Sequence, residues 1–391
     1  MKRNSVTLRI LPDLIVLAGL GLGVVLVLRP AWLGLNIHSA GSIVPHVIPT
    51  VTAPAFLFPL VFIAIMWSAI RAAVHAEAIA NKLKEPFGTL VLTISAVVIE
   101  VALVLGVMIS SNGGDTVARD TLFATLMLIM NGLVGIAIIA GALRKREQPF
   151  NAQSSSAYLG LIAALCTIGL ILPRLTTAEP GGYMTDQMDI FVGGASLGVF
   201  IAFITLQSSS HREFFTYSLD GGSSTSAHTH ARSRPLWVSA SLLILSLVTV
   251  VFLAESLGGL LATFLSRRFL PESLQGVAIA FLVLLPEGIA AIRSALGSNV
   301  QRTINILHGS ALSTIGLTIP LVLLAAGCLG REVELGLEPP EICLLTATII
   351  ISILHFGQGK TNMMQGIVHA MFFAIWIAVL MEYDLPNANL P

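Results

Sequence analysis

The sequence predicts an all-α membrane protein of about eleven transmembrane helices, one extra helix followed by two inverted five-helix repeats. Three observations support this prediction. Of the 391 residues, 55% are hydrophobic and only 11% are charged, whereas a soluble domain carries about 25% charged residues. About eleven segments have the length and apolar character of a membrane span. Two of these segments carry a glutamate at matching places in the two halves of the chain.

The apolar segments are separated by short polar connections. The first resembles a signal peptide, but no small-x-small cleavage site follows its apolar stretch, so we expect it to remain as a helix. The glycines and prolines inside the segments are typical of membrane helices. The expected spans are 12–29, 53–74, 87–110, 120–143, 157–173, 188–207, 236–258, 274–293, 304–328, 341–356 and 363–381.

The positive charges of the connections predict the orientation. Assigning alternate connections to two sides places about 15 of the 21 lysine and arginine residues on the side of the N-terminus. Because cytoplasmic connections are enriched in lysine and arginine, the N-terminus is expected in the cytoplasm and the C-terminus outside. The expected location is therefore the plasma (inner) membrane, which the chain crosses several times.

The longest polar stretch, 207–235, is rich in serine, glycine and histidine. It divides the chain into an N-terminal extra helix and connection (1–50), a first repeat (51–206), a cytoplasmic linker (207–235) and a second repeat (236–391). Its His211, His228 and His230 could bind a metal ion, but their spacing matches no defined site, and a solvated tether is the favoured interpretation.

The two halves show similar features in the same order. Glu100 and Glu287 each lie in the second helix of a half, and an odd helix number gives the halves opposite topology. One helix earlier, Glu77 corresponds to Glu255; one helix later, Asn131 corresponds to His308-Gly309-Ser310. Secondary transporters have this plan, with the substrate at the midplane between equivalent helices.

Glu100 and Glu287 are the candidate cation- and proton-binding residues, and the candidate metal ligands. A carboxylate within the hydrocarbon costs at least a few kcal/mol, so it usually faces a cavity, a partner or a permeant ion. Two facing carboxylates suit one divalent cation, and without a cation at least one should hold a proton. Cation and proton would then compete for one site, as coupled exchange requires. The alternative is a structural carboxyl bonded to a neighbouring helix.

Several polar residues on adjacent helices could support this site. Asn131, Ser310 and Ser313 could complete an oxygen shell or form interhelical hydrogen bonds. His308 could transfer protons or be a buried structural histidine. Glu77 and Glu255, nearer helix ends, could guide ions or simply lie at the interface.

Other features of the sequence carry less functional information. Pro286 and Pro320 free backbone carbonyls for coordination or merely kink their helices. Ser95 and Thr93 are expected to bond to their own helix backbone. For His355 and His369 a structural role is favoured. Cys166, Cys328 and Cys343 have no metal-type spacing and are interpreted as small hydrophobic residues. No nucleotide-binding or hydrolase motif is present in the sequence, so no cofactor, nucleic-acid partner or ATP-driven transport is expected.

Several segments resemble a known family. HAEAIANKLKEPFGTLVLTISAVVIEVALV, RDTLFATLMLIMNGLVG, LLPEGIAAIRSALGSNVQRTINILHGSALSTIGLTIP and FGQGKTNMMQGIVHA resemble bacterial Cha-type calcium/proton antiporters of the cation/calcium exchanger superfamily, which includes the CAX proteins. The resemblance implies an eleven-helix antiporter with two inverted repeats, whose repeat glutamates correspond to Glu100 and Glu287. The polar helix of the family's second repeat corresponds to residues 308–313 of this chain.

The chain departs from the eukaryotic calcium/proton exchangers at two places. The Gly-Asn pair that precedes each of their repeat glutamates is replaced by Ala96-Val97 and Val283-Leu284, and the acidic run between the halves is replaced by the serine- and histidine-rich linker. Related bacterial transporters accept Na⁺ or K⁺. The leading hypothesis is therefore a secondary active antiporter of a cation, first Ca²⁺ and alternatively Na⁺ or K⁺, for protons by alternating access. The alternatives are a monovalent-selective Na⁺/H⁺ antiporter, an intramembrane enzyme using the carboxylate pair, and a channel.

Overall fold

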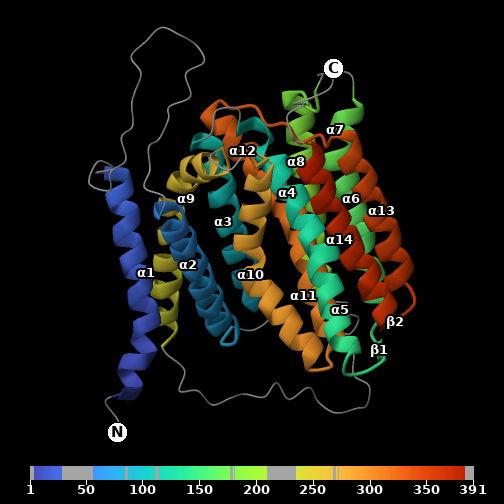
Figure 1. The fold of residues 1–391 in the computed structure, drawn as a ribbon, viewed down its shortest axis with the longest axis horizontal. Coiled ribbons are helices and arrows are strands. Elements are labelled where there is room, and N and C mark those ends of the chain that lie inside the picture. Colours follow the sequence, from blue (N-terminus) through green and yellow to red (C-terminus); the bar gives the residue numbers. More distant parts are fainter. Residues whose placement is uncertain are drawn as a thin grey trace.

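The protein is a bundle of long helices (Figure 1). The computed structural model describes residues 4–28, 56–83, 87–110, 114–176, 179, 181–208, 235–266, 270–271 and 273–383. The α-helices are α1 (Asn4–Leu28), α2 (Leu57–Ala80), α3 (Phe87–Ser110), α4 (Val117–Met127), α5 (Val134–Ala142), α6 (Ala152–Cys166), α7 (Leu172–Leu175), α8 (Asp186–Ser208), α9 (Leu236–Ser266), α10 (Leu274–Leu296), α11 (Val300–Ser313), α12 (Ile319–Leu329), α13 (Pro339–Phe356) and α14 (Met363–Tyr383). Two short strands, β1 (Glu147–Pro149) and β2 (Lys360–Asn362), pair antiparallel.

Three continuous helical rods contain a π-helical segment. Segment η3 (Leu128–Leu133) joins α4 to α5, η4 (Thr167–Ile171) joins α6 to α7, and η6 (Thr314–Thr318) joins α11 to α12. A π-helical turn holds an extra residue, so it changes which side chains face a neighbouring helix, and such turns are frequent at functional sites. A 3₁₀ turn, η2 (Gly114–Thr116), precedes α4.

Ten helical rods in the described part of the chain are long and apolar enough to cross a membrane, and α1 adds a shorter apolar stretch, Pro12–Leu26. The prediction of an all-α membrane protein with eleven apolar helices is therefore confirmed. The bounds differ most at α1, which begins at Asn4 instead of 12, at α9, which continues to Ser266 instead of ending near 258, and at α2, which ends at Ala80 instead of 74. Helix α9 continues because its sequence stays apolar beyond 258, and α2 continues through the alanine-rich, helix-favouring stretch HAEAIA.

The two halves have opposite directions and matching contacts. Figure 1 shows that α2 runs in the opposite direction to α9, its equivalent in the second half, and that α3 runs in the opposite direction to α10. Equivalent helices also make equivalent contacts across the two halves. Helix α9 packs on α3 as α2 packs on α10, and α14 packs on α5 as α8 packs on α12. Likewise, α10 packs on η3 and α5 as α3 packs on η6 and α12. This arrangement agrees with the predicted pair of inverted five-helix repeats.

Most of the predicted linker lies outside the described residues, including His211, His228 and His230. Helix α8 ends at Ser208 and α9 begins at Leu236. The predicted limits of the repeats and the linker therefore remain predictions.

Glycines allow two helix pairs of the bundle centre to approach closely. A Cβ atom at Gly106 of α3 would lie 2.6 Å from the backbone of Ala254 in α9, and one at Gly276 of α10 would lie 2.7 Å from the backbone of Asp120 in α4. Atoms at such distances overlap, so any larger residue would push the helices apart. Glycine at these positions keeps α3 and α10, the two glutamate-bearing helices, packed against neighbouring spans.

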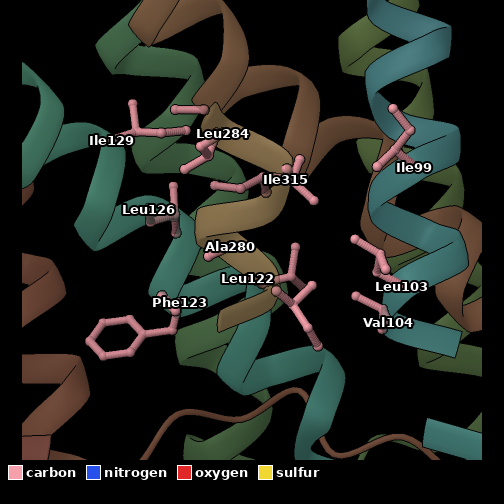
Figure 2. Close-up of a cluster of buried hydrophobic side chains, with 14 of the residues drawn as sticks. Ile99, Leu103, Val104, Leu122, Phe123, Leu126, Ile129, Ala280, Leu284 and Ile315 are labelled. Atoms are coloured by element: carbon pink, nitrogen blue, oxygen red, sulfur yellow. The ribbon is translucent and has the colours of Figure 1, made fainter. Parts of the chain in front are cut away.

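An apolar cluster fills the space between α3, α4, α10 and η6 (Figure 2). Leu103 and Val104 of α3 point toward Leu122 of α4, with Ala280 of α10 and Ile315 of η6 nearby. All five are buried to 2% exposure or less. The burial of these side chains removes apolar surface from water and lipid and holds together the helices that carry the candidate site.

Charged residues at the end of the bundle where α4 begins join the two halves. Arg119 of α4 binds Glu334, and Arg174 of α7 donates from Nη2 to Oε2 of Glu338 at 2.7 Å. Both glutamates belong to the connection between α12 and α13, whose Leu335 is fully buried. Burial raises the pKa of the Glu334 carboxyl, although the Arg119 guanidinium lowers it. The connection is thus held against the first half by ion pairs and apolar packing.

Helix α1 is joined to α2 by a second charged group. Oδ1 of Asp13 accepts hydrogen bonds from Nε and Nη2 of Arg71 at 3.0 and 2.6 Å, and lies 3.1 Å from Nε2 of His75. Nε1 of Trp67 donates to the carbonyl oxygen of Pro12 at 3.0 Å. The extra helix is therefore bonded to the first repeat as well as packed against α2 and α9.

Candidate cation site

Glu100 lies on α3 and is 1% exposed. Its Oε2 accepts hydrogen bonds from Oγ1 of Thr314 at 3.2 Å and from Oγ1 of Thr318 at 2.8 Å. Its Oε1 is buried and has no hydrogen-bond partner among the described residues. The carboxylate is therefore bonded on one side and unpaired on the other.

Glu287 lies on α10 between Pro286 and Gly288, within electrostatic range of Glu100. Its Oε2 is buried and likewise has no partner in the described part of the protein. A Cβ atom at Gly288 would lie 3.0 Å from the side chain of Leu133, so α10 packs closely against η3 at this level. Pro286 lacks the donor that would bond the carbonyl of Leu282, as the sequence predicts.

Each glutamate lies beside a π-helical segment that belongs to the third span of the opposite half. Glu100 contacts η6, and α10 packs against η3 beside Glu287. The two carboxylates come from equivalent helices, as predicted from sequence. Since a bare buried carboxylate oxygen is costly, two of them in one region form an environment suited to a cation or a proton.

Sequence reasoning missed Thr314 and Thr318, the two residues that bind Glu100. The signal that could have found them is their spacing of four residues in an apolar helix, with Thr318 two residues before Pro320. Such a spacing places two hydroxyls on one helix face. Ser310 and Ser313, which were considered instead, lie before η6, and Ser313 donates from Oγ to the carbonyl of Ser310 at 2.9 Å.

Asn131 lies in η3 and is bonded away from the glutamates. Its Nδ2 donates to Oγ1 of Thr348 in α13 at 2.8 Å, and its Oδ1 lies 3.2 Å from Nδ1 of His369 in α14. Nε2 of His369 lies 3.3 Å from Nδ1 of His355. Asn131 thus joins η3 to the last two spans, which is the interhelical role considered for it.

His308 of α11 is fully buried, and neither of its ring nitrogens has a partner in the described part of the chain. Its ring packs edge-on against Phe356, with 4.8 Å between ring centroids. Glu77 and Glu255 are exposed on α2 and α9. Ser95 donates to the carbonyl of Val91 at 2.6 Å, so its predicted backbone bond is confirmed.

A helical membrane bundle of two inverted halves, each with a carboxylate in its second helix, defines a membrane ion exchanger. The chain belongs to the sodium/calcium exchanger protein family, whose model matches residues 53–209 and 238–381. This match confirms the resemblance to the cation/calcium exchanger superfamily, and it identifies a transporter rather than an enzyme.

Two relatives cover most of the chain. The protein y4hA of Sinorhizobium fredii (strain NBRC 101917 / NGR234) is 35% identical over 341 residues, which are 86% of this chain and 91% of that protein. The sodium-potassium/proton antiporter ChaA of Escherichia coli (strain K12) is 31% identical over 324 residues, which are 82% and 87%. The predicted resemblance to Cha-type antiporters is thereby confirmed.

Two solved structures share the fold. Native YfkE superposes with a TM-score of 0.71 at 15% identity, covering 94% of this chain and 99% of that one. The H⁺/Ca²⁺ exchanger CAX superposes with a TM-score of 0.66 at 14% identity, covering 96% and 92%. At these identities the likeness concerns the architecture alone.

Proposed function

We propose that this protein exchanges a cation for protons across the membrane by alternating access, with Glu100 and Glu287 as the shared cation and proton site. The observation that carries the proposal is the pair of buried, unpaired carboxylate oxygens, Oε1 of Glu100 and Oε2 of Glu287. Each half contributes one of them. An unpaired carboxylate oxygen in this environment needs a proton or a cation.

Competition between the two kinds of ion provides the coupling. A cation that enters between the carboxylates displaces the proton or protons held there, and protons arriving from the other side displace the cation. Exchange follows if the halves change access only when the site is neutralised, because an uncompensated charge is costly to enclose. The inverted arrangement of the halves supports such a change about a fixed central site.

We propose Na⁺ or K⁺ as the transported cation. The relative with 31% identity is named a sodium-potassium/proton antiporter, whereas proteins named Ca²⁺/H⁺ antiporters are 20% identical to this chain. Ca²⁺, which the sequence favoured, remains the second candidate. Two carboxylates match its charge, and two more distant relatives are named for it.

The orientation is proposed from the connection charges, with the N-terminus in the cytoplasm, the C-terminus outside, and the plasma (inner) membrane as location. On this assignment the ion-paired connection between α12 and α13 lies on the outer side, because α14 ends at the same end of the bundle (Figure 1).

The experiment is a transport assay with purified protein in sealed lipid vesicles. A proton gradient is imposed, and Na⁺, K⁺ or Ca²⁺ is added in turn while an internal dye reports pH. The proposal requires proton movement that depends on at least one of the three cations and is absent from protein-free vesicles. Proton movement with choline alone, or none with any cation, would contradict it.

A further inference from the structure

We propose that Thr314 and Thr318 determine cation specificity: by binding one oxygen of Glu100, they leave it a single cation-facing oxygen and thereby favour a monovalent cation over Ca²⁺. The inference rests on the proposed exchange at Glu100 and Glu287 and concerns which cation that site selects.

The geometry at Glu100 is one-sided. Both threonine hydroxyls donate to the same atom, Oε2, at 3.2 and 2.8 Å, and both threonines are buried. A carboxylate oxygen has about two lone-pair directions, so two donated hydrogen bonds occupy Oε2. Only Oε1, which is buried and unpaired, is free to meet a cation.

The two hydroxyls bond to a different kind of acceptor from most other hydroxyls in the membrane helices. Thr249, Thr263 and Ser246 each donate at 2.8 Å to the carbonyl four residues earlier in their own helix. This is the usual bond of serine and threonine within helices. Thr314 and Thr318 bracket the π-helical segment η6 and donate across to α3 instead. The π-helical segment η6 therefore carries both of the hydroxyls that bind the Glu100 carboxylate.

The π-helical segment equivalent to η6 in the other half has no such pair of hydroxyls. Segment η3, beside Glu287, has the sequence LIMNGL and contains no hydroxyl side chain. Its one polar side chain, that of Asn131, is bonded to Thr348 and His369. The hydroxyl pair at Glu100 is thus not a general consequence of the repeat and distinguishes the two carboxylates.

The consequence for specificity follows from ligand number. Ca²⁺ takes six to eight oxygen ligands and often both oxygens of a carboxylate. A Glu100 restricted to Oε1 supplies one oxygen where an unrestricted glutamate could supply two. Removing the hydroxyls should free Oε2 and raise the preference for Ca²⁺ relative to Na⁺.

The test compares full-length wild type with Thr314→Val, Thr318→Val and the double variant in the vesicle assay. The measured quantity is the ratio of the apparent KM for Na⁺ to that for Ca²⁺, together with kcat for each. We expect this ratio to rise about tenfold in the double variant, which means a greater preference for Ca²⁺. A change of this size corresponds to the loss of one hydrogen bond to a charged group. Thr318→Ser, which keeps the hydroxyl, should behave like wild type. Thr318→Ala is measured alongside in case valine prevents folding.

Thr249→Val is the matched control, because it removes a buried hydroxyl that bonds only its own helix at 2.8 Å. It should leave the ratio unchanged. An unchanged ratio in folded Thr314/Thr318 variants would overturn the inference, and so would a Thr318→Ser variant that behaves like valine. If wild type itself exchanges no cation for protons, the proposed function fails instead. The two failures are therefore distinguishable.

Discussion

Arg119 at the start of α4 donates from Nη1 to Oε1 of Glu334, a residue 215 positions later in the chain. The side chains are 10% and 12% exposed, so this ion pair between the two halves is largely removed from water. It lies with Asp120, Arg174 and Glu338 at one end of the bundle. Any movement that separates the halves at this end must break it.

Arg119→Met should destabilise the folded protein by about 3 kcal/mol, because Glu334 would stay largely buried with only the more distant Arg174, 3.8 Å from its Oε1, to balance its charge. Arg119 lowers the pKa of Glu334, which burial raises, so the variant carboxyl should have a pKa further above that of the unfolded chain. The folded variant then binds a proton more readily than the unfolded chain does, and its stability falls as pH rises through the folded-state pKa.

The thermal unfolding temperature in detergent checks this prediction. The difference from wild type should be larger at about pH 8 than at about pH 5. Adding Glu334→Gln to the variant should recover much of the loss, because the poorly compensated charge of Glu334 is then absent. A pH-independent difference that the second substitution does not reduce would show that Arg119 acts through packing alone.

Glu100→Gln and Glu287→Gln should each abolish cation-dependent proton movement in vesicles. The substitution keeps size and much hydrogen bonding but deletes the charge and the exchangeable proton. The amount of folded protein should stay equal or increase, since a buried ionisable group is neutralised. Glu→Asp at either position should retain part of the activity with altered cation affinity. Wild-type exchange rates in both glutamine variants would disprove the proposed mechanism.

Glu77→Gln and Glu255→Gln are the matched controls for the carboxylate pair. Both side chains are exposed on α2 and α9, so neither substitution removes a buried charge. We expect reduced rates with coupling preserved, measured as protons moved per cation. Complete loss of exchange in either control would place the essential carboxylates nearer the helix ends than we propose.

A reporter fused after Pro391 tests the orientation. Because the connections on the N-terminal side hold most lysine and arginine residues, a reporter that works only outside the cytoplasm should be active there. The same reporter inserted between Arg144 and Glu147 should be inactive, since that connection lies at the opposite end of the bundle. Reversed activities would invert the assigned sides.

Replacing His211, His228 and His230 together by Ala should leave the exchange rate within about twofold of wild type, as expected for a solvated tether. The measurement is the vesicle assay with and without added Zn²⁺. If the wild-type rate responds to Zn²⁺ and the variant's does not, the linker carries a regulatory metal site.

The sequence by itself determined the membrane class, the eleven apolar helices and the two central glutamates. The reason is that a span must match the bilayer thickness with apolar side chains, and this property is local to each segment. The cost of a carboxylate in hydrocarbon also depends mainly on its own position in the span, so Glu100 and Glu287 were recognisable without a structure.

The tertiary structure alone decided which side chains meet these carboxylates. Thr314 and Thr318 reach Glu100 from 214 and 218 positions away, while Ser313 bonds its own helix and Asn131 bonds Thr348 and His369. The π-helical segments explain why periodicity was insufficient, because an extra residue in a turn rotates every later side chain to a new face. Which side chains meet across the bundle depends on such rotations and on the close helix packing at Gly106 and Gly276. The sequence of a single segment specifies neither of these.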